Sequence, residues 1–61
     1  MMTFNELYHI NYAWQTRTQL TIINNTAEKM SASEARRKYG DYTVDYINGD
    51  RVCLSNPEED N

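Results

Sequence analysis

The chain has few of the residues that build disulfides, metal centres or sharp chain reversals. It contains one cysteine, one histidine, one proline and two glycines in 61 residues. Cys53 therefore has no intramolecular disulfide partner, and with His9 it supplies only two of the four ligands of a structural zinc site. A single free thiol is typical of a reducing compartment.

Long apolar segments are also missing. The sequence has no run of about 18 apolar residues, and its first residues lack the charged-then-apolar order of a signal peptide. We therefore expect a soluble, unexported, cytoplasmic protein with no membrane contact. A domain of this length buries only about 60% of its unfolded surface. Because a cofactor-sized pocket would use up most of so small a core, we expect no cofactor and no enzyme, whereas self-association is favoured.

The net charge of −3 is concentrated near the end of the sequence. Residues 1–54 contain equal numbers of cations and carboxylates, and Glu58, Glu59 and Asp60 supply the excess. An acidic run of this kind is usually a solvated, disordered end, and less often a docking peptide or a nucleic-acid mimic. We therefore predict one domain over residues 1–55 and an acidic disordered tail over residues 56–61.

Capping and alternation patterns define the first half of the domain. Thr3-Phe4-Asn5-Glu6 has the form of a capping box and begins a helix predicted over residues 4–9. Residues 18–23 are rich in β-branched side chains and predict a strand. Asn24-Asn25-Thr26 is a turn signal, and residues 27–30 return as the second strand of a hairpin.

The second half begins with another helix. Ser31-Ala32-Ser33-Glu34 is a second capping box, and Gly40 suits the position just past the helix C-terminus. Ala32 and Ala35 share one helix face with Tyr39, and their small side chains would let this helix approach a sheet closely.

A second hairpin follows, in which residues 42–46 alternate and residues 51–54 can pair with them. A two-residue turn at Asn48-Gly49 would pair Val44 with Cys53. A three-residue loop ending in Gly49 would instead pair Val44 with Val52, and the pattern favours this second register. It keeps one apolar set on one face: Tyr42, Val44, Tyr46, Val52 and Leu54. The complete order predicts an α+β fold with an antiparallel sheet of about four strands and two short helices on one face.

Candidate catalytic groups do not combine into a site. No carboxylate or nucleophile stands at a supporting spacing beside His9, and Cys53 lies mid-strand without basic neighbours, as a structural thiol does. Asp41, Asp45 and Asp50 are spread over a strand and a turn, without the dense spacing of a calcium loop. We therefore expect neither catalysis nor a bound metal.

The surplus of aromatic residues is more informative. Five tyrosines and one tryptophan exceed what so small a core can hide, and both types are favoured anchors of protein interfaces. Arg36-Arg37-Lys38 is the only basic cluster, and it could meet phosphates or an acidic partner, although a solvated helix face is the simpler explanation. The predicted partner-binding residues are Tyr12, Trp14, Arg36, Arg37, Tyr42 and Tyr46. Uncovered strand edges and this aromatic surface also predict a homodimer with Trp14 near its interface.

Residues 31–47, which read Ser-Ala-Ser-Glu-Ala-Arg-Arg-Lys-Tyr-Gly-Asp-Tyr-Thr-Val-Asp-Tyr-Ile, resemble a segment of small accessory proteins of phages and prophages from Gram-positive bacteria. The likeness covers the second half strongly and the first half in outline, and it carries over no functional residue. Proteins of this size and origin include anti-CRISPR and other anti-defence inhibitors. The resemblance implies stoichiometric binding and inhibition of a host or defence protein, such as a CRISPR nuclease, in the host cytoplasm. The alternative is a nucleic-acid-associated protein that uses the Arg36-Arg37-Lys38 helix end.

Overall fold

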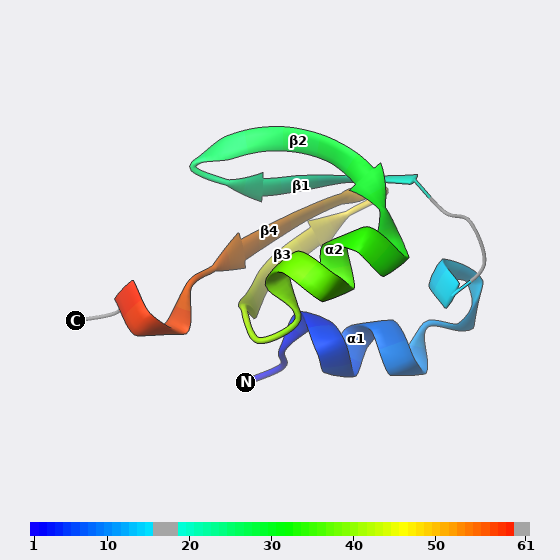
Figure 1. Ribbon diagram of the computed structural model, residues 1–61, viewed down its shortest axis with the longest axis horizontal. Coiled ribbons are helices and arrows are strands. Elements are labelled where there is room, and N and C mark those ends of the chain that lie inside the picture. The colour runs from blue at the N-terminus through cyan, green and yellow to red at the C-terminus, as the bar shows by residue number, and fades with distance from the viewer. Residues whose placement is uncertain (16–18, 60–61) are drawn as a thin grey trace.

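The computed structural model describes residues 1–15 and 19–59. In chain order the elements are α1 (Phe4–Ile10), the 3-10 turn η1 (Tyr12–Gln15), β1 (Gln19–Asn24), β2 (Thr26–Ser31), α2 (Ala32–Tyr39), β3 (Thr43–Asn48), β4 (Arg51–Ser55) and the 3-10 turn η2 (Pro57–Glu59) (Figure 1). The predicted α+β class, its two helices and its four strands are confirmed. The predicted start of the first strand, at Thr18, lies outside the described residues.

The sheet is mixed, whereas an antiparallel sheet was predicted. Its strand order is β2-β1-β4-β3, with two antiparallel hairpins and a parallel pairing of β1 with β4 at the centre. The reason is topological. Helix α2 carries the chain from β2 to the opposite edge of the sheet, so β3 runs parallel to β2, and the second hairpin then returns β4 beside β1.

Both predicted helix starts form. The Thr3 hydroxyl accepts a hydrogen bond from the Glu6 amide at 3.2 Å, and the Glu6 carboxylate accepts one from the Thr3 amide at 2.9 Å. At the start of α2, the Ser31 hydroxyl accepts from the Glu34 amide at 3.2 Å. These caps satisfy amides that have no partner inside the helix, which explains why the two helices begin where the sequence indicates.

Gly40 ends α2, as predicted, for a steric reason. Its backbone is right-handed, with φ −56°, so a left-handed conformation is not what requires glycine. A Cβ atom at this position would lie 2.7 Å from the carbonyl oxygen of Arg36. The Gly40 carbonyl also accepts a hydrogen bond from the Asn5 amide at 2.9 Å, which ties the end of α2 to the start of α1.

The loop of the second hairpin ends one residue later than in both predicted registers. Asn48 pairs with Arg51, so Gly49 and Asp50 form the turn. Gly49 has φ +65°, a backbone conformation that glycine adopts without steric penalty. Both predicted registers are therefore wrong, because each placed Asn48 inside the loop.

A β-bulge in β3 offsets the shift in strand register that this turn produces. The pairing shifts between Val44, which lies opposite Leu54, and Tyr46, which lies opposite Cys53. Asp45 is the extra residue. Because a bulge adds one residue to one strand, Val44 still faces the same side as Leu54, whereas Tyr46 faces the other side. The predicted common face for Tyr46 and Val44 is therefore wrong.

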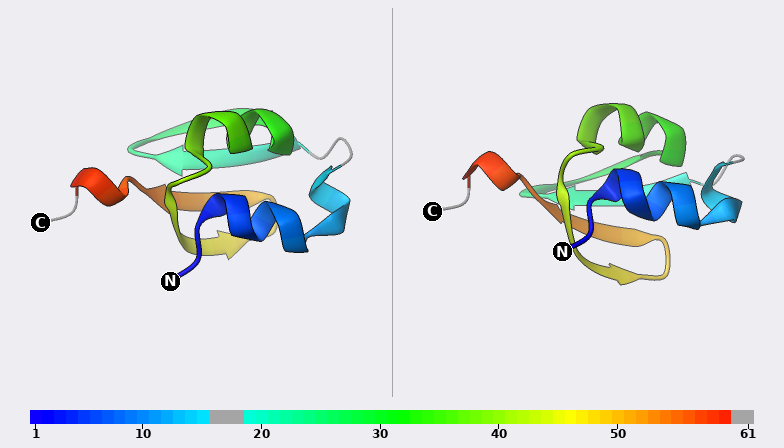
Figure 2. Two further views of the ribbon diagram at one scale, coloured as in Figure 1. Left: turned by 60° about the horizontal axis from the view of Figure 1, so that its bottom comes forward. Right: turned by 90° about the horizontal axis from the view of Figure 1, so that it is seen from below.

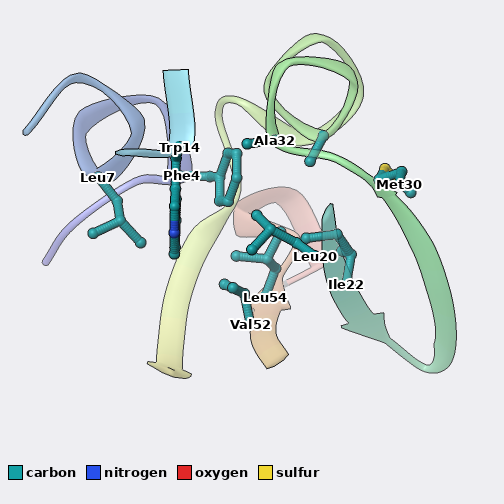
Figure 3. Packing of buried hydrophobic residues seen from close by; sticks show 10 residues of the cluster. Phe4, Leu7, Trp14, Leu20, Ile22, Met30, Ala32, Val52 and Leu54 are labelled. Atoms are coloured by element: carbon teal, nitrogen blue, oxygen red, sulfur yellow. The ribbon is translucent and has the colours of Figure 1, made fainter. Parts of the chain in front are cut away.

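Both helices cover the same face of the sheet (Figure 2), and buried side chains fill the space between them. The core, seen from close by in Figure 3, consists of Phe4, Leu7, Trp14, Leu20, Ile22, Met30, Ala32, Ala35, Val52 and Leu54. Ala32 and Ala35 are at most 1% exposed. Their burial is consistent with the prediction that small residues let α2 approach the sheet closely.

The chain keeps a defined conformation past Pro57, although a disordered tail was predicted from residue 56. Pro57–Glu59 form η2, and the Asn56 side-chain oxygen accepts from the Glu58 amide at 2.9 Å. The Asn56 amide nitrogen also donates to the Tyr42 hydroxyl at 3.3 Å, which anchors this segment to the domain. The last two acidic-tail positions, residues 60–61, lie outside the described residues.

Candidate functional site

The four strands present one face to the helices and one face away from them, and the second is called the open face. Alternation along β1 and β4 sends Leu20, Ile22, Val52 and Leu54 into the core. The residues between them therefore point the other way. Within residues 1–15 and 19–59, no helix or strand packs on this side (Figures 1 and 2).

The strand register aligns one apolar row across the middle of the open face. Ile23 pairs with Ala27 on β2 and with Cys53 on β4, and Cys53 in turn lies opposite Tyr46 on β3. This apolar row is Ala27, Ile23, Cys53 and Tyr46. Ile23 and Cys53 are half-buried, whereas Tyr46 is 55% exposed. The row thus presents continuous apolar surface from one edge of the sheet to the other.

A basic row runs beside the apolar row. Thr21 pairs with Lys29 on β2 and with Arg51 on β4, and Arg51 pairs with Asn48 on β3. The basic row is therefore Lys29, Thr21, Arg51 and Asn48. Lys29 and Arg51 are both exposed. With two strand spacings between them, their backbones lie about 10 Å apart.

An acidic group lies on the other side of the apolar row. The Asp45 carboxylate accepts a hydrogen bond from the Ser55 hydroxyl and lies 4.0 Å from the Cys53 sulfur. Cys53 and Ser55 are two residues apart on one strand and so share a face, which places the carboxylate on the open face. The bulge is what brings Asp45 here, since it is the extra residue of β3. The open face therefore changes from basic through apolar to acidic.

The acidic end borders a shallow depression of about 510 Å³. Its lining consists of Met1, Asn24, Asn25, Thr43, Asp45, Leu54, Ser55, Asn56 and Pro57. Asp45 is the charged residue of this lining, and Met1, Leu54 and Pro57 give it an apolar part. The Asp45 carboxylate accepts hydrogen bonds from an ammonium or guanidinium group and repels an anion.

No protein-family model, no curated protein and no solved structure matches this chain.

Trp14 does not belong to a contact surface, which corrects the prediction that it binds a partner or lies at a dimer interface. It is 8% exposed, and its indole stacks on Phe4 with the ring centroids 5.9 Å apart and an interplanar angle of 21° (Figure 3). The small core needs a large aromatic side chain to fill the end between α1 and the sheet. Trp14, one of the aromatic residues expected in excess of the core, is therefore a core residue.

The three tyrosines among the predicted partner-binding residues are separated by the fold. Tyr12 is 83% exposed on η1, on the helix side. Tyr42 is half-buried, because its ring packs edge-on against Tyr39 with centroids 4.9 Å apart. Tyr46 is the one that reaches the open face. Sequence reasoning therefore identified one residue of this surface and missed its neighbours Ile23, Cys53, Lys29 and Arg51.

Two members of the α2 basic cluster have partners on different elements. Arg36 donates to the Asn5 side-chain oxygen at 2.9 Å, and its guanidinium lies 5.2 Å from the ring centroid of Tyr8. Lys38 pairs with Glu28 at 3.6 Å. Arg36 thus contacts α1 and Lys38 contacts β2, while the side chains of Arg36, Arg37 and Lys38 are all exposed. Binding of a phosphate backbone by this cluster stays a prediction.

The candidate catalytic side chains remain apart. His9 lies on α1, on the helix side of the sheet, whereas Cys53 lies on the open face. In residues 1–15 and 19–59, no three His, Cys, Asp or Glu side chains gather where a metal ion could bind. Across the same residues, no helix is both long enough and apolar enough to span a membrane.

Proposed function

We propose that the chain works by stoichiometric contact with another protein, and that the open face is the contact surface. The observation that carries this proposal is the apolar row, which crosses the whole sheet without any described element on top of it. A half-buried apolar strip with charged residues on both sides has the layout of a protein interface, namely an apolar centre and a polar rim.

The proposed role of this contact is inhibition of a host or defence protein in the cytoplasm of a bacterial host. The resemblance of residues 31–47 to small phage accessory proteins supports this role. A stoichiometric inhibitor needs a rigid, preformed surface and no catalytic group. A four-stranded sheet supported by helices on its other face provides such a rigid surface.

Cys53 allows a direct test, because the single cysteine of the chain lies in the middle of the open face. Its thiol would be coupled to a maleimide photo-crosslinker and the labelled protein irradiated in lysate of a Gram-positive host. The matched control carries Cys53→Ala with Ser33→Cys, which moves the probe to an exposed position of α2. We expect a discrete crosslinked product from the Cys53 probe alone. The same pattern from both positions, or no product from either, would contradict the proposed contact surface.

A further inference from the structure

We infer that a second copy of this chain closes the open face and forms a two-fold dimer centred on Cys53. This inference rests on the proposed function, because it assigns the same contact surface to a second copy, which a host protein would have to displace. It is carried by the charge layout of the open face, which is basic at one end, apolar in the middle and acidic at the other end. A surface of this kind complements itself when it is turned around and laid on a second copy.

Strand β4 shows the self-complementarity most directly. Arg51, Cys53 and Ser55 alternate with the core residues of β4, so all three side chains point to the open face, about 7 Å apart along the strand. Cys53 is therefore the midpoint between Arg51 and Ser55 on β4, and the Asp45 carboxylate of β3 lies against Ser55. A two-fold axis through Cys53 exchanges these two ends.

Charge decides between the two simple ways of stacking the sheets. If the two-fold axis ran along β4, the basic rows of the two copies would lie over the same line, and Arg51 would repel its equivalent. If the axis runs across the strands, Arg51 of one copy faces Asp45 and Ser55 of the other. Opposite charges attract and like charges repel at these separations. The second arrangement is therefore the one we propose, with the apolar rows in contact at the centre.

Asp45 and Ser55, which lie on the open face and also line the depression, give Arg51 of the second copy its hydrogen-bond acceptors. The lining of this depression includes Asp45, Ser55, Asn24 and Asn25, which together offer a carboxylate and several neutral oxygens. A guanidinium needs several acceptors arranged around a plane. Lys29, two strands further toward the β2 edge, would meet the second copy's β1–β2 turn.

The size of the open face predicts a weak dimer. Four strands of about 20 Å length, spaced at about 4.8 Å, present roughly 400 Å² per copy. Two such faces bury about 800 Å² in total, which is less than the 1,200 Å² or more of most stable interfaces. We therefore expect a dissociation constant on the order of 100 µM, with monomer and dimer in exchange.

Charge exchange between two variants tests this arrangement. Arg51→Glu places two carboxylates against each other in a homodimer, and Asp45→Arg places two cations against each other. Each variant alone should remain monomeric from about 10 µM to about 1 mM, whereas the wild-type protein dimerises over this range. An equimolar mixture should associate again. In the mixed dimer, the glutamate introduced in one variant would face the arginine introduced in the other, and the unchanged Asp45 would face the unchanged Arg51. Arg37→Glu, the same charge change at an exposed position of α2, is the matched control and should dimerise like the wild type.

Sedimentation equilibrium measures the association, and circular dichroism shows that each variant is folded. If Asp45→Arg does not fold, a short bismaleimide linker decides instead. Stacked sheets lie about 10 Å apart, and the two Cys53 side chains would both point into this gap, so their thiols would lie closer together than the backbones. We expect a crosslinked product of twice the chain mass from the wild-type protein, and much less of this product from Arg51→Glu.

A wild-type protein that stays monomeric to about 1 mM and gives no crosslinked dimer would overturn the inferred dimer. So would a mixture of the two charge variants that stays monomeric although both are folded. Neither result removes the proposed function, since photo-crosslinking from Cys53 to a polypeptide of a different mass would still support it. An acidic host protein captured in that experiment would make a heterologous partner the occupant of the open face.

Discussion

Ile22 and Ile23 are neighbours in β1 and have the same side chain, but they lie in opposite environments. Ile22 faces the helices and is 1% exposed, whereas Ile23 lies half-buried on the open face beside Cys53. Val52 and Cys53 repeat this contrast in β4. The difference between the two faces shows that this small domain separates the residues that hold it together from the residues free to contact another molecule.

The largest expected effect on stability is at the face of the sheet that the helices cover, called the covered face. Ile22→Ala removes a fully buried side chain and leaves a cavity under α2, which destabilises a core by about 3–4 kcal/mol. A domain of this length has a free energy of unfolding of about 3–9 kcal/mol. We therefore expect a partly or fully unfolded protein at 37 °C, measured by urea denaturation with circular dichroism. A loss below about 1 kcal/mol would mean that the helices do not cover this face tightly.

Crowding the covered face should have a smaller effect. Ala35 is fully buried on the inner side of α2, and Ala35→Leu inserts three carbon atoms where the helix packs closely. Overpacking of this kind costs about 1–3 kcal/mol. Arg37→Leu on the exposed side of the same helix is the control, with an expected change within about 0.5 kcal/mol. Thermal melts of the two variants should separate clearly, and equal melting temperatures would show that α2 can move away from the sheet.

The matched substitution on the open face should affect association more than stability. Ile23→Ala removes a half-buried side chain and should lower the free energy of unfolding by about 1 kcal/mol or less. Because Ile23 lies in the middle of the apolar row, self-association should weaken at least about tenfold, as measured by sedimentation equilibrium. If Ile23→Ala is as destabilising as Ile22→Ala, the two faces do not differ as proposed.

The smallest change in stability is expected at the basic row. Arg51→Gln keeps a long polar side chain and removes one exposed charge, so the free energy of unfolding should change by less than about 0.5 kcal/mol. Association should become weaker and less sensitive to salt, since a pairing of opposite charges is screened by ions. Lys38→Gln provides the control. It breaks the exposed pair with Glu28, costs at most about 1 kcal/mol, and should leave association and its salt dependence unchanged.

Local sequence signals predicted most of the secondary structure. Thr3 with Glu6 and Ser31 with Glu34 mark the helix starts, and Asn25, with φ +68°, is the turn residue of the first hairpin. These features depend on neighbouring residues, and their physical causes can be read from a few consecutive positions. The register of the second hairpin could not be read in this way, because the Gly49-Asp50 turn and the bulge at Asp45 compensate for each other.

The open face depends on contacts between residues far apart in the sequence. Ile23 and Cys53 become neighbours only through the parallel pairing of β1 with β4, which no local pattern encodes. An assumption of antiparallel pairing throughout therefore hid the apolar row. The same limit applies to Trp14, since aromatic content indicates an interface or a core equally well until the packing partner, here Phe4, is known.

Strand β4 is the last strand of the sheet in chain order, yet it lies between β1 and β3. During synthesis on the ribosome, the first hairpin and both helices emerge before the strand that joins the two halves of the sheet. Until residues 51–55 are available, Val52 and Leu54 are missing from the core, and Leu20 and Ile22 lack their central packing partners. The domain therefore cannot complete its core until β4 has been synthesised, and polypeptides that stop before β4 should be recognised as unfolded and degraded.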